Sequence, residues 1–198
     1  MKNLIYAAIT MALTFSACCN QKQSNMNPTF LELAERRFSV RKYAQTPVEQ
    51  EKIDKILRAA QVAPTAKNNQ PQRIYVLKSE ESIAKINQLS KSAYRAPVVF
   101  MVCYDVTGVW TNPLDNNAHS GETDAAIVGV HMMFEAAEQG LATCWVKNFN
   151  PKEVAEAFDI PSTQQVSFLI DCGYADKNAK PAPMHSNKKE ISDFVKEL

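Results

Sequence analysis

Apolar and polar residues alternate along this chain with two different periods, one helical and one strand-like. Apolar residues recur at helical spacing in four segments: residues 30–34, 53–60, 83–89 and 122–139. Three mainly apolar segments predict strands: residues 74–77, 98–104 and 166–172, of which 98–104 is a continuous apolar run typical of a fully buried strand. By pattern alone, strand runs that alternate with helices favour a parallel α/β sheet covered by helices.

Local signals indicate where some of these helices begin and end. Thr46-Pro47-Val48-Glu49 has the composition of a capping box, so a second helix is expected to begin here and to end near Val62. Thr123 is a candidate cap for the longest helix, and Gly140 is a candidate stop. A last short helix is predicted over residues 190–198.

The longest helical segment, residues 122–139, is apolar around nearly its whole circumference. A helix of this kind has to be buried on every side, and a chain of 198 residues forms one domain with limited room for that. We therefore expect part of this helix to meet a second subunit.

Residues 36–43, here called the basic octet, read Arg-Arg-Phe-Ser-Val-Arg-Lys-Tyr. In extended backbone the side chains of Arg37, Ser39 and Arg41 point the same way. Guanidinium groups bind phosphate oxygens in a bidentate manner, and a serine hydroxyl adds a neutral donor. The octet therefore predicts a phosphate-binding site; a solvated basic end of a helix is the alternative.

Composition excludes several other kinds of site. A net charge of +1 gives no reason to expect nucleic-acid binding. The three histidines form no H-E-x-x-H and the five cysteines no C-x-x-C, so no metal site is expected. With only five glycines, the chain also lacks the G-x-G-x-x-G loop of dinucleotide-binding folds and the G-x-S-x-G of serine hydrolases.

The N-terminus has the features of an export signal. Residues 1–17 place one lysine before a mostly apolar stretch that is too short for a comfortable membrane span, so a signal peptide is expected. Phe15-Ser16-Ala17-Cys18 resembles a bacterial lipobox, with Phe where Leu is usual, in which Cys18 would be lipidated. Ordinary signal cleavage and an uncleaved anchor are the alternatives. Residues 18–28 would form a flexible tether and residues 29–198 the folded domain, giving an envelope lipoprotein that faces the periplasm; without a true signal the protein would be cytoplasmic.

Three motifs in the folded part resemble those of the nitroreductase family of FMN enzymes, and the resemblance covers nearly all of the chain from about Phe30 onwards. The R-x-S-x-R signature is matched at three positions: Arg37, Ser39 and Arg41. The loop motif P-S-x-x-N-x-Q-P-W is matched, with Thr for Ser and Gln72 for Trp, at five positions: Pro64, Thr65, Asn68, Gln70 and Pro71. Residues 140–145 are similar to the segment G-L-G-T-C-W, with Ala142 in place of Gly.

This resemblance implies an α+β, nitroreductase-like fold: a central, mostly antiparallel sheet flanked by helices, in a homodimer with FMN at the interface. It replaces the parallel sheet that the alternation of elements favours. The octet residues, together with Lys188 or Lys189, would hold the FMN phosphate, although an exposed basic turn is the alternative for either lysine.

The flavin ring would be met by two other segments. The amides of Asn68 and Gln70 suit the alternating donors and acceptors on the flavin edge, or else they satisfy the turn in which they lie. Backbone amides at Leu141 and Ala142 would approach the ring and tune it without a catalytic side chain.

The implied activity is FMN-dependent oxidoreduction. NAD(P)H would pass hydride to the flavin, and a nitroaromatic, a quinone or a similar small aromatic acceptor would then collect the electrons. Trp110, in the polar loop 105–121, could stack on such an acceptor, or the loop could be an anchored surface segment. No side chain is required as acid or base, so none is named as catalytic.

Export would separate such an enzyme from the cytoplasmic nicotinamide pool, and two other functions therefore stay open. A reductive dehalogenase of the same fold would use the Trp110 loop to clamp a zwitterionic halogenated aromatic. A non-enzymatic envelope lipoprotein would bind no flavin.

Overall fold

The computed structural model of the protein describes residues 28–198, apart from the side chains of residues 116 and 117. The expected signal peptide, Cys18 and nearly all of the tether lie outside the described residues, so the lipid anchor stays a prediction. Within the described part, no helix combines the length and the apolar content that crossing a bilayer requires.

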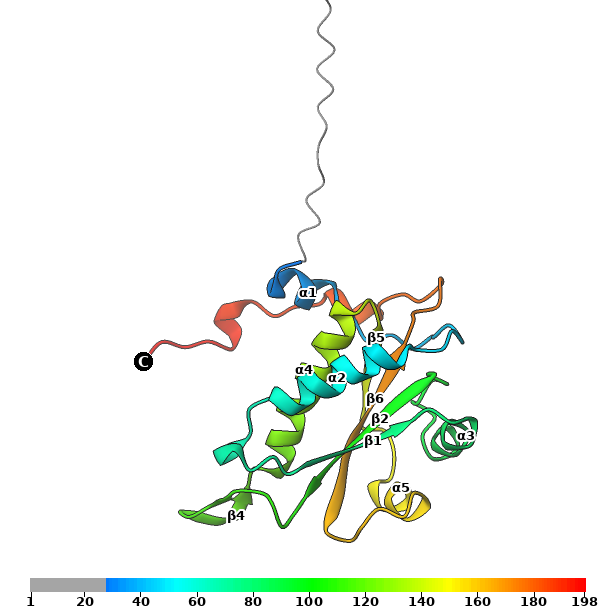
Figure 1. Cartoon of the computed structure of the whole chain (residues 1–198). Coiled ribbons are helices and arrows are strands. Elements are labelled where there is room, and N and C mark those ends of the chain that lie inside the picture. Colours follow the sequence, from blue (N-terminus) through cyan, green and yellow to red (C-terminus); the bar gives the residue numbers. More distant parts are fainter. Residues whose placement is uncertain (1–27) are drawn as a thin grey trace, which may run out of the picture.

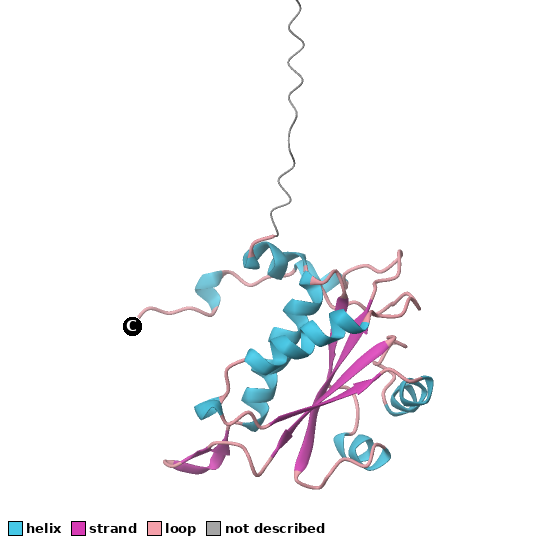
Figure 2. Ribbon diagram, in the orientation of Figure 1, coloured by secondary structure: helices cyan, strands magenta, loops and turns pink. Residues whose placement is uncertain are grey.

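Four strands form the central sheet: β1 (Gln72–Leu77), β2 (Val98–Asp105), β5 (Ala142–Val146) and β6 (Gln164–Gly173). Their order is β1-β2-β6-β5, and every neighbouring pair is antiparallel. Figure 2 shows the strands crossing the middle of the molecule, with helices around them. The fold class implied by the resemblance is therefore confirmed, and the parallel sheet favoured by alternation alone is wrong.

Helices cover both faces of this sheet (Figure 1). On one face lie α2 (Gln50–Val62) and α4 (Gly121–Glu138), and on the other lie α3 (Glu80–Leu89) and α5 (Pro151–Ala157). The short α1 (Phe30–Arg36) packs against α4 through the Phe30 and Phe134 rings, whose centroids are 4.8 Å apart. Cover on both faces explains why the strands are mainly apolar segments rather than alternating ones.

The remaining elements are short. Within the polar loop, β3 (Thr111–Asn112) and β4 (Asp115–His119) form a small hairpin. Single helical turns occur at η1 (Ala66–Asn68), η2 (Pro183–Ser186) and η3 (Ile191–Asp193).

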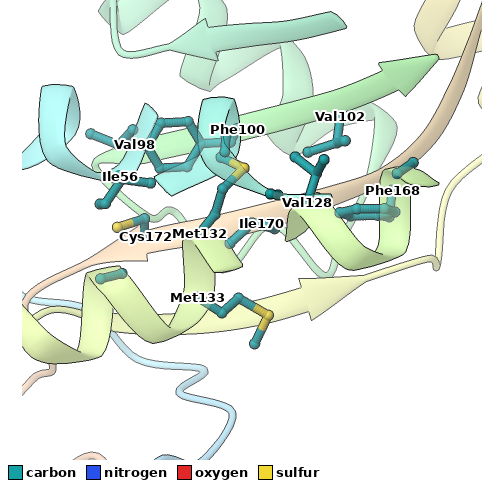
Figure 3. Close-up of a cluster of buried hydrophobic side chains, with 14 of the residues drawn as sticks. Ile56, Val98, Phe100, Val102, Val128, Met132, Met133, Phe168, Ile170 and Cys172 are labelled. Atoms are coloured by element: carbon teal, nitrogen blue, oxygen red, sulfur yellow. The ribbon is translucent and has the colours of Figure 1, made fainter. Parts of the chain in front are cut away.

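The larger core lies between α4 and the sheet (Figure 3), where Val128 and Met132 of the helix meet Phe100 and Phe168 of the strands. Gly129 permits this close approach, because a Cβ atom there would stand only 2.6 Å from the Phe168 ring. The indole of Trp145 stacks on the same phenyl ring, with centroids 3.6 Å apart. Burial of α4 against the strands thus fixes the position of β5 through Trp145.

Some predicted helix ends were wrong. The second helix begins at Gln50 instead of Pro47, and Glu49 makes no side-chain cap bond; its carboxylate accepts the Tyr174 hydroxyl at 2.7 and 2.9 Å. The long helix begins after Ser120 and is not capped by Thr123. The helix predicted over residues 190–198 is only the single turn η3, because so short a segment without packing does not offset the cost of helix nucleation.

Candidate functional site

The basic octet leaves α1 and continues as extended backbone beside β5. Arg37 is the C-cap of α1 and already has extended dihedral angles (φ −66°, ψ 130°). Ser39 forms a parallel bridge with Thr143, and the Val40 N–H donates to the Thr143 carbonyl at 3.1 Å. This pairing keeps the segment extended, which places the side chains of Arg37, Ser39 and Arg41 on one side of it.

Arg37 and Arg41 form no ion pair with the carboxylates of residues 28–198. The Arg41 Nη1 donates to the Ser39 carbonyl at 3.2 Å. The Arg37 Nη1 is buried and has no hydrogen-bond partner within the described part of the chain. A buried unpartnered donor is costly, so an anion that accepted a hydrogen bond from it would remove that cost.

A cavity of about 330 Å³ lies beside the octet, between α1, the end of α4 and β5. Residues named from the sequence, Arg37, Leu141 and Ala142, are in its lining. The Leu141 N–H donates to the Ala136 carbonyl at 2.8 Å and closes the end of α4 after Gly140, which has φ 73°. The Leu141 amide is therefore committed to the helix cap, and what this residue offers a ligand is its side chain.

The amide loop, residues 63–72, joins α2 to β1 and brings Asn68 and Gln70 together. The Gln70 side-chain amide donates to the Asn68 Oδ1 at 3.0 Å, and the Gln70 N–H donates to the Thr65 hydroxyl at 3.1 Å. Part of the loop therefore satisfies its own turn, as the alternative interpretation held. Lys67, Asn68 and Gln70 nevertheless have φ of 53°, 56° and 51°, and such left-handed backbone is strained in non-glycine residues and recurs at binding loops.

Asp124, which the sequence analysis missed, anchors the amide loop to the first turn of α4. It is buried, and its Oδ1 accepts the Ala66 N–H at 2.8 Å. Its Oδ2 is also buried and has no partner among residues 28–198. Its helical spacing to the apolar residues Val128 and Met132 was the sequence signal that could have identified it.

Within one chain, the octet and the amide loop, which are the two halves of the predicted site, lie far apart. The amide loop is attached to Asp124 in the first turn of α4, whereas the cavity beside the octet includes Ala137 in the last turn. With a rise of about 1.5 Å per residue, these two positions are roughly 20 Å apart along the helix axis. In Figure 1 the octet follows α1 at one end of α4, and the loop after α2 lies at the other end.

Lys188 lies on a turn that contacts the octet. Its Nζ donates to the His185 carbonyl at 2.8 Å, and the His185 ring packs edge-on against Phe38 with centroids 6.0 Å apart. Both Lys188 and Lys189 are exposed. The structure therefore places this basic turn beside the octet half of the site.

Trp110 lies in the other half. The backbone N–H of Trp110 donates to the Ser120 hydroxyl at 3.0 Å, and the Trp110 carbonyl accepts the Ser120 N–H at 2.9 Å. Ser120 immediately precedes α4, so Trp110 is fixed at the same end of this helix as the amide loop. Its indole is half-buried, and its backbone bonds to Ser120 assign Trp110 to the half of the site that holds Asn68 and Gln70.

An antiparallel sheet with helices on both faces, a basic extended segment at its β5 edge and a strained amide loop define a domain of the α+β class. The model of the nitroreductase family matches residues 34–95 and 89–174 of this chain, so the protein belongs to the nitroreductase family.

Known relatives agree with this assignment. The chain is 37% identical to a nitroreductase family protein of Clostridium difficile 630, with a TM-score of 0.80 over 85% of this chain and 98% of that one. It is 27% identical to an FMN-dependent nitroreductase of Clostridium difficile R20291, with a TM-score of 0.65 over 82% and 93% of the two chains. An FMN reductase [NAD(P)H] of Bacillus subtilis is 28% identical over 78% of this chain and 69% of its own length.

Proposed function

We propose that the protein is an FMN-dependent oxidoreductase that passes electrons from NAD(P)H to a nitroaromatic, a quinone or a similar small aromatic acceptor. The relatives named for FMN and NAD(P)H support the donor and the cofactor. The observation that carries the proposal is the basic octet: two arginines without ion pairs in extended backbone, one with a buried N–H that has no partner among the described residues.

The donors at this position fit a phosphate monoester. The guanidinium groups of Arg37 and Arg41 offer charged donors, and the Ser39 hydroxyl adds a neutral one. Lys188, on the adjoining turn, adds a mobile positive charge. The cavity beside the octet gives the chain that links phosphate to ring an apolar wall of Leu141 and Ala142.

Bound FMN would supply the hydride chemistry, accepting two electrons from the donor and returning them to the acceptor. The residues of this chain bind and orient. The octet fixes the phosphate, the side-chain amides of Asn68 and Gln70 address the polar edge of the ring, and Trp110 offers an aromatic face to the acceptor. No side chain of the site is needed as an acid or base, so catalysis depends on position and on exclusion of water.

We further propose that the active unit is a homodimer in which the octet of one subunit and the amide loop of the other meet one flavin. The ribityl chain is much shorter than the separation of these halves along α4. An apolar surface on α4 and α1 is also left open: Phe30 is 69% and Val130 44% exposed, and Phe134 is half-buried between them. A second copy of this surface would bury these side chains.

The function is tested on the purified full chain after loading with FMN. We expect a flavin absorption band that stays with the protein on gel filtration, and oxidation of NADH or NADPH when a quinone or nitroaromatic is present. A colourless protein that oxidises neither donor would leave the alternative of a non-enzymatic lipoprotein. Turnover restricted to halogenated aromatics would favour the dehalogenase.

The dimer is tested with Val130→Asp, which puts a charge in the centre of the open surface. We expect the molar mass by light scattering to fall from that of a dimer to that of a monomer, with loss of bound FMN. Ala84→Asp is the matched control, because Ala84 is exposed on α3, which covers the other face of the sheet, and the change should alter neither quantity. A wild-type monomer that binds FMN tightly would disprove the shared site.

A further inference from the structure

Asp171 is a buried carboxylate that none of the roles above uses. It lies in β6 and is 0% exposed, and neither of its carboxylate oxygens has a hydrogen-bond partner within residues 28–198. In the sheet it stands opposite Val99 of β2 and Cys144 of β5. Ionisation would leave an unpaired charge in apolar surroundings, so the protonated form is favoured. Burial accordingly raises the pKa of Asp171 to about 8.

The backbone of the octet is tied to the same place. The buried Tyr43 hydroxyl donates to the Val40 carbonyl at 2.9 Å and approaches the Asp171 carbonyl at 3.4 Å. Val40 is in turn bound to Thr143, the residue before Cys144. Asp171 therefore lies close to the backbone of the octet, next to the residues that pair with it.

Asp171 and the octet both affect the pKa of the Cys144 thiol. Burial raises the pKa of its thiol and Asp171 raises it further, while Arg41, Ser39 and Arg37 lower it. Cys144 is the strand neighbour of Asp171 and follows Thr143, which pairs with Ser39 of the octet.

The other titratable groups packed here come from four segments of the chain. Tyr43 belongs to the octet and has Tyr94 of the loop after α3 beside it, while Cys144 lies in β5 and Cys172 in β6. Burial raises the pKa of Tyr43, of Cys144 and of Cys172, the last to about 12. Compared with these three groups, Asp171 is the one that changes charge near pH 8.

We propose that the proton on Asp171 controls how tightly the octet holds the phosphate of FMN; this inference rests on the function proposed above. While the carboxyl is neutral, Arg37 and Arg41 present their full positive charge to the phosphate. Loss of the proton puts a negative charge close to the octet, where it repels the phosphate dianion and attracts the same guanidinium groups. Linkage makes the effect reciprocal, so binding of FMN near pH 8 is accompanied by proton uptake.

The test compares FMN with riboflavin, which has the same ring and ribityl chain but no phosphate. The Kd of the full-length protein for each flavin is measured by fluorescence quenching between about pH 7 and 9, above the second phosphate pKa near 6. We expect the Kd for FMN to rise about tenfold, the size given by one unit charge at roughly 10 Å and an effective dielectric constant of about 20. The Kd for riboflavin should stay constant.

Asp171→Asn keeps the shape of the side chain and removes its titration, so its Kd for FMN should not depend on pH in this range. If the asparagine variant folds poorly, Asp171→Val takes its place, because valine suits a buried strand. Its Kd for FMN should likewise not depend on pH. Asp54→Asn is the control and should keep the wild-type profile, because Asp54 is exposed on α2, where it accepts a hydrogen bond from Gln50.

The possible outcomes separate the two proposals. Three results would overturn the role of Asp171 and leave the FMN function intact. The first is a wild-type Kd for FMN that does not change with pH, and the second is a Kd for riboflavin that rises equally. The third is a pH profile of Asp171→Asn that matches the wild type. FMN binding at no pH would overturn both. Proton uptake on FMN binding at pH 8, measured by calorimetry in buffers of different ionisation enthalpy, is expected in the wild type and not in Asp171→Asn.

Discussion

Replacing Arg37 and Arg41 together by alanine is expected to weaken FMN binding about a thousandfold. Each guanidinium would make charge-assisted hydrogen bonds to the phosphate, worth about 1.5–3 kcal/mol apiece, and every 1.4 kcal/mol is about tenfold in Kd. Either single variant should lose about 10- to 100-fold by the same reasoning. The measurement is the Kd from quenching of flavin fluorescence at neutral pH.

Riboflavin and a distant arginine provide the controls. Since riboflavin carries no phosphate, its Kd should change little in the double variant. Arg58→Ala removes an exposed arginine of α2 that bonds only to Gln61 within the described chain, and it should leave both affinities unchanged. A double variant that binds FMN as tightly as the wild type would remove the octet from the site and with it the main support for the proposed function.

The second large effect concerns stability, where Asp171→Asn is expected to unfold less readily than the wild type at pH 8. Burial raises the pKa of Asp171 from its usual 3.8 to about 8, so between these values the folded protein keeps a proton that the unfolded chain has lost. The free energy of unfolding of the wild type therefore falls as pH rises through this window and levels off above it. Asparagine does not titrate, so the advantage of the variant should grow by about 1.4 kcal/mol per pH unit.

Urea unfolding between about pH 5 and 9 measures this difference, and Asp176→Asn is a control of opposite sign. The Asn178 backbone N–H and Lys42 hold the pKa of Asp176 below its usual range. Its contribution to stability is therefore present above the pKa of the unfolded chain and is lost as pH falls. Parallel curves for the wild type and Asp171→Asn would show that Asp171 ionises normally in the fold.

Hydrophobic periodicity predicted most elements, because a segment buried in the core carries apolar residues at a regular spacing in its own sequence. The stripe of Ile53, Ile56 and Ala60 faces the core, and the mainly apolar segments became β1, β2 and β6. Strand direction left no such pattern, because a strand covered on both faces is equally apolar in parallel and antiparallel sheets. That choice came from family resemblance and was confirmed by the pairing of the strands.

Local capping rules failed where distant residues competed for the same groups. Glu49 was expected to complete a capping box, but its carboxylate is bound by the hydroxyl of Tyr174, 125 residues further along the chain. The C-terminal segment failed for the opposite reason. It has helix-forming residues, yet Ile191 is 70% exposed and Phe194 68%, so no packing stabilises a helix there.

The sequence by itself determined the chemistry available: the arginines and the hydroxyl of the octet, the amides of the loop, and the apolar segments that build the domain. Only the tertiary structure decided where these groups stand, placing the octet and the loop at opposite ends of α4 and using the Leu141 amide as a helix cap. It also decided which carboxylates are buried, Asp124 and Asp171 among them. The physical reason is that burial, hydrogen-bond competition and separation in space are set by residues distant along the chain, whereas charge and periodicity are local.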